Sequence, residues 1–299
     1  MFSREDCAHM ARALQLAARG RYSARPNPMV GCVLVNDGVV VGEGWHERAG
    51  EPHAEINALR EAGEKARGAV AYVSLEPCAH HGKTPPCATA LIEAGVSKLI
   101  AAMQDPFDEV AGRGIEALRA NGIEAEVGLM QSAAEALNAA FISRVTRGRP
   151  FVRLKIAASL DGAIAMESGE SQWITSPEAR EDVQRLRARS GSIMTGIGTV
   201  LADDPSLNVR SSDIDMPGDQ PLRVVLDSRL RTPVTARMLA LPGETLICCT
   251  AGSDGSALRE AGAMVQEFGA HGDVVNVFEV LAALAERETN EVLVEAGPR

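Results

Sequence analysis

Three residues of the first half have the types and spacing of a zinc site. His53 begins a predicted helix, Cys78 follows a predicted strand, and Cys87 lies at the start of the next predicted helix. One imidazole and two thiolates leave the fourth tetrahedral position to water, which is the ligand set of a catalytic zinc site. We therefore predict one zinc ion per chain, bound by these three side chains.

Glu55 is the predicted proton carrier of this site. Zinc lowers the pKa of bound water from about 16 to about 7, but a base must still take the proton and an acid must protonate the leaving group. Glu55 lies two residues after His53, where its carboxylate can reach the water without binding the metal. His-x-Glu followed by Pro-Cys is typical of zinc nucleobase deaminases.

The residues alone leave two alternatives open. His80 or His81 could complete a closed, structural zinc site, or the segment could be rich in thiols without holding a metal. Eight residues separate Cys78 from Cys87, whereas most deaminases of this type have Cys-x-x-Cys. The order of the motifs favours the catalytic site.

The elements that must position these residues alternate along the first half. A helix begins after Ser3, whose capping box uses Asp6, and the turn Asn36-Asp37-Gly38 joins two strands in a hairpin. Further helices are predicted over 53–62, 86–94, 113–121 and 132–145, and strands over 69–75, 98–102 and 124–127. This alternation predicts a three-layer α/β domain over residues 1–147.

A second α/β domain is predicted over residues 148–299. Basic residues, Gly148 and Pro150 end the preceding helix, and a new apolar strand begins at once. Strands are expected over 151–157, 192–195, 222–227, 244–249 and 291–295, and helices over 177–189, 256–261 and 277–287. The first strand is not followed by Gly-x-Gly-x-x-Gly, so these patterns alone name no nucleotide.

Composition narrows the function classes. The 299 residues carry 30 Lys and Arg against 40 Asp and Glu, and this net charge of −10 argues against a nucleic-acid partner. Apolar runs are strand-length, which argues against a membrane partner, and the charged start argues against a secretory signal, so a cytoplasmic location is expected. The remaining cysteines, Cys7, Cys32, Cys248 and Cys249, are predicted to be small core residues.

The segment from Glu76 to Cys87 resembles the RibD family, the bifunctional deaminase-reductases of riboflavin biosynthesis. The segments 25–32, 42–46 and 104–114 are also similar to that family. The resemblance implies a cytidine-deaminase-like fold and deamination of 2,5-diamino-6-(5-phosphoribosylamino)pyrimidin-4-one. In the implied reaction zinc hydroxide attacks the ring carbon that carries the amine, C2, and ammonia leaves with a proton from Glu55.

Four polar residues are expected around the pyrimidine and its ribose phosphate. They come from the segments that resemble the family and are Asn27, His46, His81 and Lys83. Two of them also have an interpretation without a ligand. Asn27 lies between two prolines, where its role could be limited to forming a turn, and Lys83 could be a solvated charge in a loop.

The second half resembles the reductase half of the same family in segments 154–162, 168–175 and 199–205. The resemblance implies a dihydrofolate-reductase-like fold, in which NADPH reduces the ribosyl group of 5-amino-6-(5-phosphoribosylamino)uracil to ribityl. The residues implied to line the NADPH site are Ala157, Trp173, Thr199, Asp203, Ser228 and Gly297. Those implied to face the substrate are Ser171, Arg187, Leu207, Arg210 and Glu295.

Physical reasoning supports some of these assignments. Arg187 and Arg210 supply forked donors that suit a ribose phosphate, although both could be surface arginines. Lys155 lies in an apolar strand, where a charge is costly unless it serves a site, so it joins the substrate candidates. Trp173 could instead be a core aromatic residue.

The family pattern continues beyond 294–298, whereas this sequence stops at Arg299. We therefore expect a C-terminally incomplete reductase domain, with strand 291–295 at an unfinished sheet edge. The predicted function is a zinc-dependent aminohydrolase fused to an NADPH-dependent oxidoreductase, acting on a small phosphoribosyl pyrimidine.

The main alternative is an active deaminase with a truncated, inactive reductase domain. A deaminase of another base and a non-catalytic zinc-stabilised binding module are further alternatives. The oligomeric state, including a homo-oligomer, stays open.

Overall fold

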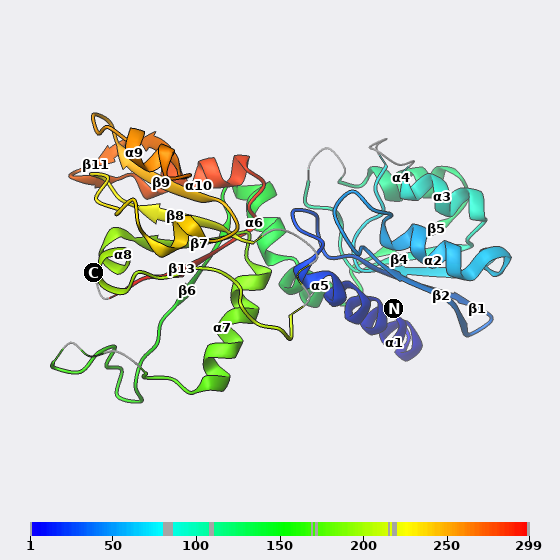
Figure 1. Ribbon diagram of the computed structural model, residues 1–299. Helices are drawn as coiled ribbons and strands as arrows, with labels where there is room; N and C mark the ends of the chain where they lie inside the picture. Colours follow the sequence, from blue (N-terminus) through cyan, green and yellow to red (C-terminus); the bar gives the residue numbers. More distant parts are fainter. Residues whose placement is uncertain are drawn as a thin grey trace. The chain divides into compact units, whose positions relative to one another are not determined.

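The computed structural model describes residues 2–79, 86–107, 111–168, 170, 173–214, 216 and 220–297. Contacts divide the chain into two compact units, Met1–Arg147 and Gly148–Arg299 (Figure 1). Each unit is built around one main sheet with helices on its faces. The α/β class predicted for both halves is confirmed.

The first unit contains a five-stranded sheet in the order β2-β1-β3-β4-β5. Its strands are β1 (Gly31–Asn36), β2 (Val39–Trp45), β3 (Val70–Val73), β4 (Lys98–Ala101) and β5 (Glu124–Val127). β1 is antiparallel to both neighbours, and the β3-β4-β5 part is parallel. The hairpin turn is confirmed, since Asp37 and Gly38 have φ of 49° and 75°, as a tight turn between twisted strands requires.

Helices cover both faces of this sheet, so the three layers are confirmed. One face packs against α2 (Ala54–Ala62), α3 (Cys87–Ala94) and α4 (Arg113–Ala120). The other packs against α1 (Arg4–Ala17), α5 (Gln131–Leu137) and α6 (Ala139–Arg147). Short 3-10 turns follow α1 and α2 at Ala18–Tyr22 and Gly63–Ala66. The predicted capping box at the start of α1 is also present.

Two details of the first unit differ from prediction. The single helix expected over 132–145 is two helices, because the chain departs from helical geometry at Asn138. The buried Asn138 amide accepts from the Met29 nitrogen at 2.8 Å and donates to the Met29 oxygen at 2.9 Å. Cys7 is exposed, because it lies off the face of α1 that carries Met10 and Leu16, whereas Cys32, Cys248 and Cys249 are buried as predicted.

A close contact sets the position of α2. A Cβ atom on Gly44 of β2 would lie 2.3 Å from the Ala54 oxygen and 2.5 Å from the Ala58 nitrogen. Only glycine therefore lets the first turn of this helix lie directly on the strand. Because His53 and Glu55 belong to the same turn, this contact also fixes the candidate site.

The second unit contains a six-stranded parallel sheet in the order β10-β9-β8-β7-β13-β6. Its strands are β6 (Phe151–Lys155), β7 (Ser192–Gly196), β8 (Leu222–Leu226), β9 (Thr245–Thr250), β10 (Met264–Phe268) and β13 (Glu291–Glu295). A separate antiparallel pair consists of β11 (Ala270–His271) and β12 (Val274–Val275).

Helices lie on both faces of this sheet as well. α8 (Ile197–Asp203) and α9 (Ser256–Glu260) pack on one face, together with the 3-10 turn Arg237–Ala240. α10 (Val277–Glu286) packs on the other, and α7 (Pro177–Arg189) contacts β13. α8 and β10 were not predicted. α8 is only seven residues long and has glycine at its start and again at Gly198, which hides its helical pattern.

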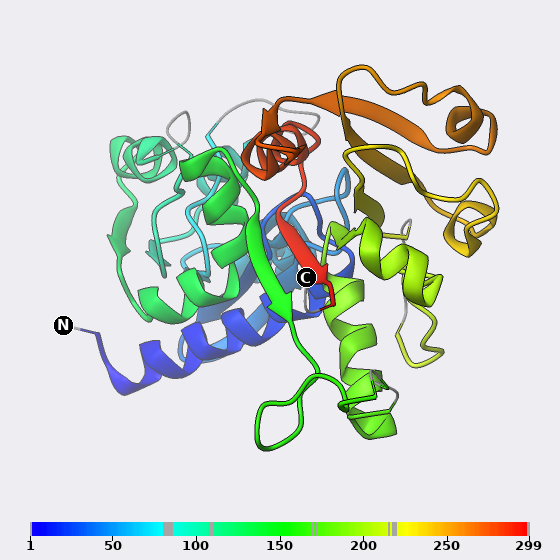
Figure 2. The ribbon, with the colours of Figure 1, turned by 90° about the vertical axis from the view of Figure 1, so that its left-hand side faces the viewer.

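The prediction that strand 291–295 lies at a sheet edge is wrong. β13 pairs with β7 on one side and β6 on the other, and Figure 2 shows the red and green arrows side by side. Val292 and Leu293 are fully buried, as expected of a parallel strand covered on both faces. The edge strand on this side of the sheet is β6, where Val152 and Leu154 are 46% and 60% exposed.

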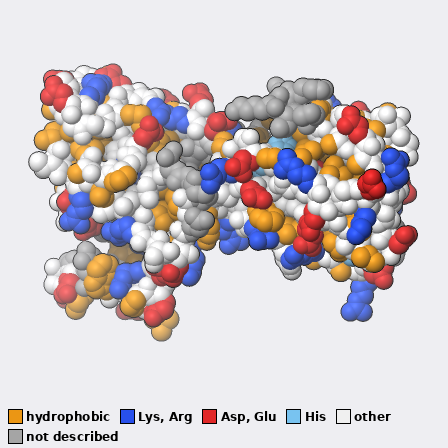
Figure 3. Space-filling model, turned by 45° about the vertical axis from the view of Figure 1, so that its right-hand side comes forward, with side chains coloured by type: hydrophobic (Ala, Val, Ile, Leu, Met, Phe, Trp, Pro, Cys, Tyr) orange, Lys and Arg blue, Asp and Glu red, His pale blue; other side chains and the backbone are white. Residues whose placement is uncertain are grey.

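Charge is mixed over the described surface. On the face drawn in Figure 3, Lys and Arg side chains alternate with Asp and Glu. On that face, neither sign of charge is gathered in one stripe. Within the described ranges, every helix is too short or too polar to cross a lipid bilayer.

Candidate functional site

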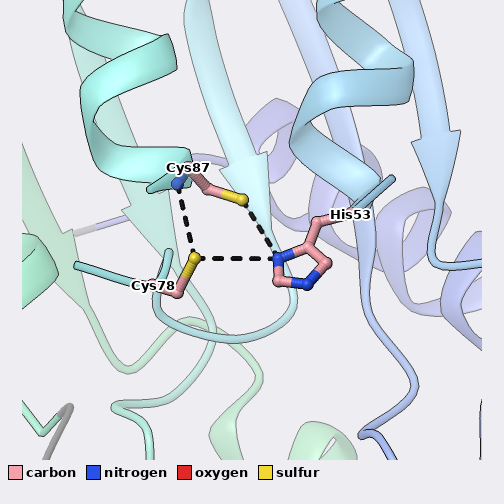
Figure 4. Close-up of side chains that lie close together, drawn as sticks. All are labelled: His53, Cys78 and Cys87. Carbon is pink, nitrogen blue, oxygen red and sulfur yellow. Dashed lines mark hydrogen bonds between the residues drawn. The ribbon is translucent and has the colours of Figure 1, made fainter. Parts of the chain in front are cut away.

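The three predicted metal ligands converge in the first unit. His53 precedes the first turn of α2, Cys87 is the first residue of α3, and Cys78 lies in the segment after β3. The Nδ1 atom of His53 is 3.7 Å from the Cys78 sulfur and 3.2 Å from the Cys87 sulfur (Figure 4). All three donor atoms lie within 4.8 Å of one another.

This geometry fits zinc. In a tetrahedral site with ordinary bond lengths, a nitrogen and a sulfur ligand are roughly 3.6 Å apart. The two nitrogen–sulfur distances lie on either side of that value. Over the residues that the structure describes, the group contains no fourth His, Cys, Asp or Glu. His80 and His81, the alternative fourth ligands, lie outside the described residues.

The two thiols are electrostatically different. A hydrogen bond with the Cys87 thiol holds the pKa of Cys78 far below its usual value, and the hydrogen bond with His53 acts in the same direction. The same contact with Cys78, together with burial, raises the pKa of Cys87. The Cys87 backbone N–H, at the start of α3, also donates to the Cys78 sulfur at 3.3 Å. Both hydrogen bonds therefore favour the thiolate form of Cys78, the form that binds metal.

Glu55 has the environment of a proton carrier. It lies in the first turn of α2 and is only 3% exposed. Burial raises the pKa of its carboxyl to about 7, the negative charge of Cys78 adds to this, and His53 opposes it. A carboxyl group with such a pKa can both accept and release a proton near neutral pH.

Asn27 and His46 form a polar pair beside this cluster. The Asn27 Nδ2 atom is 3.0 Å from His46 Nε2, and His46 Nδ1 is 3.2 Å from the Pro52 oxygen. A carbonyl only accepts, so Nδ1 carries the ring proton and Nε2 accepts from Asn27. Burial lowers the pKa of His46, which keeps the ring neutral. The ring meets that of His53 edge-on, with centroids 5.2 Å apart, while His81 and Lys83 lie outside the described residues.

Four of the predicted NADPH residues follow the carboxyl ends of parallel strands in the second unit. Ala157 follows β6, Thr199 follows β7, Ser228 follows β8 and Gly297 follows β13. In open α/β sheets, ligands bind outside this edge. The structure links two of them directly, because the Gly297 nitrogen donates to the Thr199 Oγ1 atom at 3.2 Å.

The other two NADPH candidates are solvent-facing. Asp203 ends α8 and is exposed. Trp173 is 71% exposed, and the Arg180 guanidinium lies 4.4 Å from its ring centre. Trp173 is therefore not a core aromatic residue. Ser171, a predicted substrate contact, lies outside the described residues.

Two predicted substrate residues bind each other. Arg187 Nε is 2.6 Å from Glu295 Oε1, and Nη2 is 2.9 Å from Oε2. Arg187 Nη1 also donates to the Asn208 oxygen at 2.9 Å, and the arginine is only 8% exposed. Arg187 is not a surface arginine, and its fork is occupied by protein rather than open to phosphate. Lys155 lies opposite Glu295 in the register of β6 with β13.

Arg210 and Leu207 lie in the same region but differ in accessibility. Arg210 is exposed, and burial together with the charge of Arg187 lowers its pKa. Its Nη1 atom is 3.4 Å from the Ser206 hydroxyl, and in the described ranges no carboxylate forms an ion pair with it. The Leu207 side chain is 2% exposed and belongs to the core. Unlike that of Arg187, the Arg210 guanidinium is exposed and is not held by a carboxylate of the described residues.

Comparisons with known proteins agree with the two-unit architecture. A model of the cytidine and deoxycytidylate deaminase zinc-binding region matches residues 3–103. A model of the RibD C-terminal domain matches residues 150–299. The riboflavin biosynthesis protein RibD of Escherichia coli K12 is 52% identical over 98% of this chain and 82% of its own length. The chain belongs to the RibD family.

Solved structures of the RibD family have the same fold. A RibD structure from Acinetobacter baumannii has a TM-score of 0.90 and 47% identity, covering 98% of this chain and 81% of its own. A Thermotoga maritima deaminase/reductase has a TM-score of 0.86 and 35% identity, with the same coverage. The predicted cytidine-deaminase-like domain followed by a reductase domain is thus confirmed.

One residue near the reductase candidates, Asp227, was not among the predicted site residues. Asp227 comes directly before Ser228 at the end of β8 and is fully buried. Its Oδ2 atom accepts from the nitrogen and the hydroxyl of Thr232, both at 2.7 Å, while Oδ1 has no partner among the described atoms. An acidic residue at the carboxyl end of a buried strand was the available signal. In this RibD family member it holds the loop that carries Ser228.

Proposed function

We propose that this chain catalyses two steps of riboflavin biosynthesis. The first is hydrolytic deamination of 2,5-diamino-6-(5-phosphoribosylamino)pyrimidin-4-one, and the second is NADPH-dependent reduction of the ribosyl group of 5-amino-6-(5-phosphoribosylamino)uracil to ribityl. Membership of the RibD family supports both steps. The observation that carries the proposal is the buried Glu55 beside the three-ligand cluster of His53, Cys78 and Cys87.

In the deaminase half, each residue has a defined task. His53, Cys78 and Cys87 would hold zinc, which supplies an activated water for attack on the pyrimidine. Glu55 accepts a proton at its carboxylate and gives it to the departing ammonia, as its pKa of about 7 permits. Asn27, oriented by the neutral His46 ring, presents its amide oxygen to a donor on the pyrimidine. His81 and Lys83 are proposed to complete the substrate site.

In the reductase half, the proposed NADPH site follows the carboxyl edge of the second sheet. Ala157, Trp173, Thr199, Asp203, Ser228 and Gly297 are its proposed residues. Arg210 is proposed to bind the substrate phosphate, because its guanidinium is exposed and has no carboxylate partner among the described residues. The remaining proposed substrate residues are Lys155, Ser171, Arg187, Leu207 and Glu295. Of these, Arg187 and Glu295 act as a pair that shapes the site.

We propose residues 1–147 as the deaminase domain and 148–299 as the reductase domain, which coincide with the two compact units of the fold. The alternative of an active deaminase with an inactive reductase is not favoured, since the family model matches the second half from residue 150 onward. A non-catalytic zinc module would need a fourth protein ligand. Six free cysteines suit a reducing compartment, so a cytoplasmic location is part of the proposal.

The direct test is an assay of the purified chain with the diaminopyrimidine ribotide. Ammonia release and NADPH oxidation are followed together, with and without NADPH. We expect ammonia in both reactions and NADPH consumption when the cofactor is present. Ammonia without NADPH consumption would support the inactive-reductase alternative, and no ammonia would overturn the assigned deamination.

A further inference from the structure

Glu76 is a buried carboxylate next to the metal ligands that takes no part in binding the metal. It is 3% exposed and is separated from Cys78 only by Pro77. Its backbone nitrogen donates to the Met103 oxygen at 3.0 Å. A buried carboxylate is costly unless its oxygens are hydrogen-bonded, so its partners must be accounted for.

Both carboxylate oxygens of Glu76 are occupied by backbone N–H groups. Oε2 accepts from Asp105 at 3.1 Å and from Gly112 at 2.9 Å. Oε1 accepts from Gly114 at 2.9 Å and from Ile115 at 3.3 Å. Three of these donors belong to the N-terminal end of α4 or its cap, where orphan N–H groups and the helix dipole favour a negative charge.

A second contact joins the same two segments. A Cβ atom on Gly114 would lie 1.9 Å from the Pro77 oxygen and 3.3 Å from Glu76 Oε1. The first turn of α4 therefore touches the backbone between Glu76 and Cys78. Any side chain at position 114 would push the two segments apart.

The three metal ligands are not supported equally by secondary structure. His53 and Cys87 lie at the starts of α2 and α3, so packing of these helices on the sheet fixes them. Cys78 lies in a segment without helix or strand. On one side this segment is held by the Ala88 nitrogen, which donates to the Cys78 oxygen at 3.2 Å. On its other side the segment is held by the Glu76 carboxylate, which accepts from the N–H groups at the start of α4. We call this contact the Glu76 clamp.

We propose that Glu76 is a positioning residue for the zinc site. By fastening the segment 76–78 to the start of α4, it sets the Cys78 sulfur at the distance from His53 and Cys87 that a tetrahedral metal requires. The inference rests on the proposed function only for the expected effect on ammonia release. The expected effect on zinc binding does not depend on it. Residues that orient metal ligands typically contribute about 10–100-fold to metal affinity or activity.

The test compares the Glu76→Gln variant with the parent chain and with Glu93→Gln, an exposed residue on α3, as matched control. Glutamine keeps the shape but turns an NH₂ group toward two N–H donors. We expect zinc affinity, measured by chelator competition, to fall about 10–100-fold. The absorption spectrum of the Co²⁺-loaded protein should also change, because its sulfur-to-metal bands report the position of Cys78. Glu93→Gln should change neither.

Reductase activity in the same chain controls for the amount of intact protein, since the second unit contains none of the altered contacts. Urea unfolding of the first unit controls for its folding. If Glu76→Gln fails to fold, Glu76→Asp tests the same contact, because it keeps the charge but shortens the side chain that reaches the N–H groups of α4, and it should weaken zinc binding in the same way. If a folded variant of the Glu76 clamp keeps the zinc affinity and the cobalt spectrum of the parent chain, the proposal is overturned. A parent chain that releases no ammonia but shows the metal effects would instead reject the proposed function and support the positioning role.

Discussion

The zinc cluster and the carboxyl edge of the second sheet position their residues in different ways. In the first unit, the predicted ligands come from one stretch between residues 53 and 87, and their donor atoms lie within 4.8 Å of one another. In the second, the candidates extend from Lys155 to Gly297, and four of them follow the carboxyl ends of different parallel strands. A metal ion needs donor atoms gathered at one point, whereas a dinucleotide needs contacts spread along an edge.

The two regions also use charge differently. At the zinc site, burial raises the pKa of the acid Glu55 to about 7, and among the described residues no ion pair with a cationic side chain opposes this. At the reductase edge the acid Glu295 is bonded to Arg187 in a two-pronged ion pair. The first arrangement suits proton transfer, and the second suits a rigid framework. The predictions below test this difference.

The largest effect is expected from losing a metal ligand. Cys87→Ser should abolish zinc binding and ammonia release, because two protein ligands no longer hold the ion tightly. NADPH oxidation with 5-amino-6-(5-phosphoribosylamino)uracil should be unchanged. Metal analysis and the two activity assays check this. Chelation of the parent chain should have the same effect, with recovery on adding zinc, and a parallel loss of reductase activity would contradict the independence of the sites.

Glu55→Gln should lower kcat for ammonia release by about 10²–10⁴-fold, the usual contribution of a general acid-base residue. The metal should stay bound, because Glu55 is not one of the three clustered ligands. Steady-state ammonia assays and metal analysis of the same sample measure both quantities. A fully active Glu55→Gln enzyme would reject the proton-carrier role.

Arg187→Ala should destabilise the reductase unit by about 3 kcal/mol, because it leaves the Glu295 carboxylate buried without its partner. Arg185→Ala is the matched control on the same helix, since its contact with Asp182 is 3.7 Å long and half-exposed. We expect a change below about 0.5 kcal/mol there. Urea unfolding, followed by signals of each unit, measures the difference. Equal stability losses in the two variants would mean that the buried pair is not a framework element.

Arg210→Ala should raise the KM for the phosphoribosyl substrate of the reductase about 10–100-fold, the effect of losing a charged hydrogen bond of about 1.5–3 kcal/mol. The KM for NADPH and the stability should change little, since Arg210 is exposed. Arg259→Ala, an exposed arginine on α9, serves as control. A rise confined to the KM for NADPH would move Arg210 to the cofactor side of the site.

Local signals predicted most of the elements. The Ser3 capping box, the Asp37-Gly38 turn and the apolar runs of β7 to β9 all occur where the sequence indicated them. The errors occur where a distant partner decides the outcome. Asn138 ends a helix because Met29, 109 residues away, offers both backbone groups. β13 is a central strand rather than an edge strand, because two strands from earlier in the chain flank it.

The kinds of donor atoms and their order along the chain were enough to determine the chemistry of the zinc site. Imidazole, thiolate and carboxylate groups carry their reactivity with them, and short spacings limit how they can meet. Tertiary structure alone decided which of the reductase candidates are already bonded to another side chain of the protein. Arg187 and Glu295 are 108 residues apart, and only the strand order that places β13 beside β7 and α7 brings them together. The same holds for Glu76, whose four donors lie 29–39 residues further along the chain.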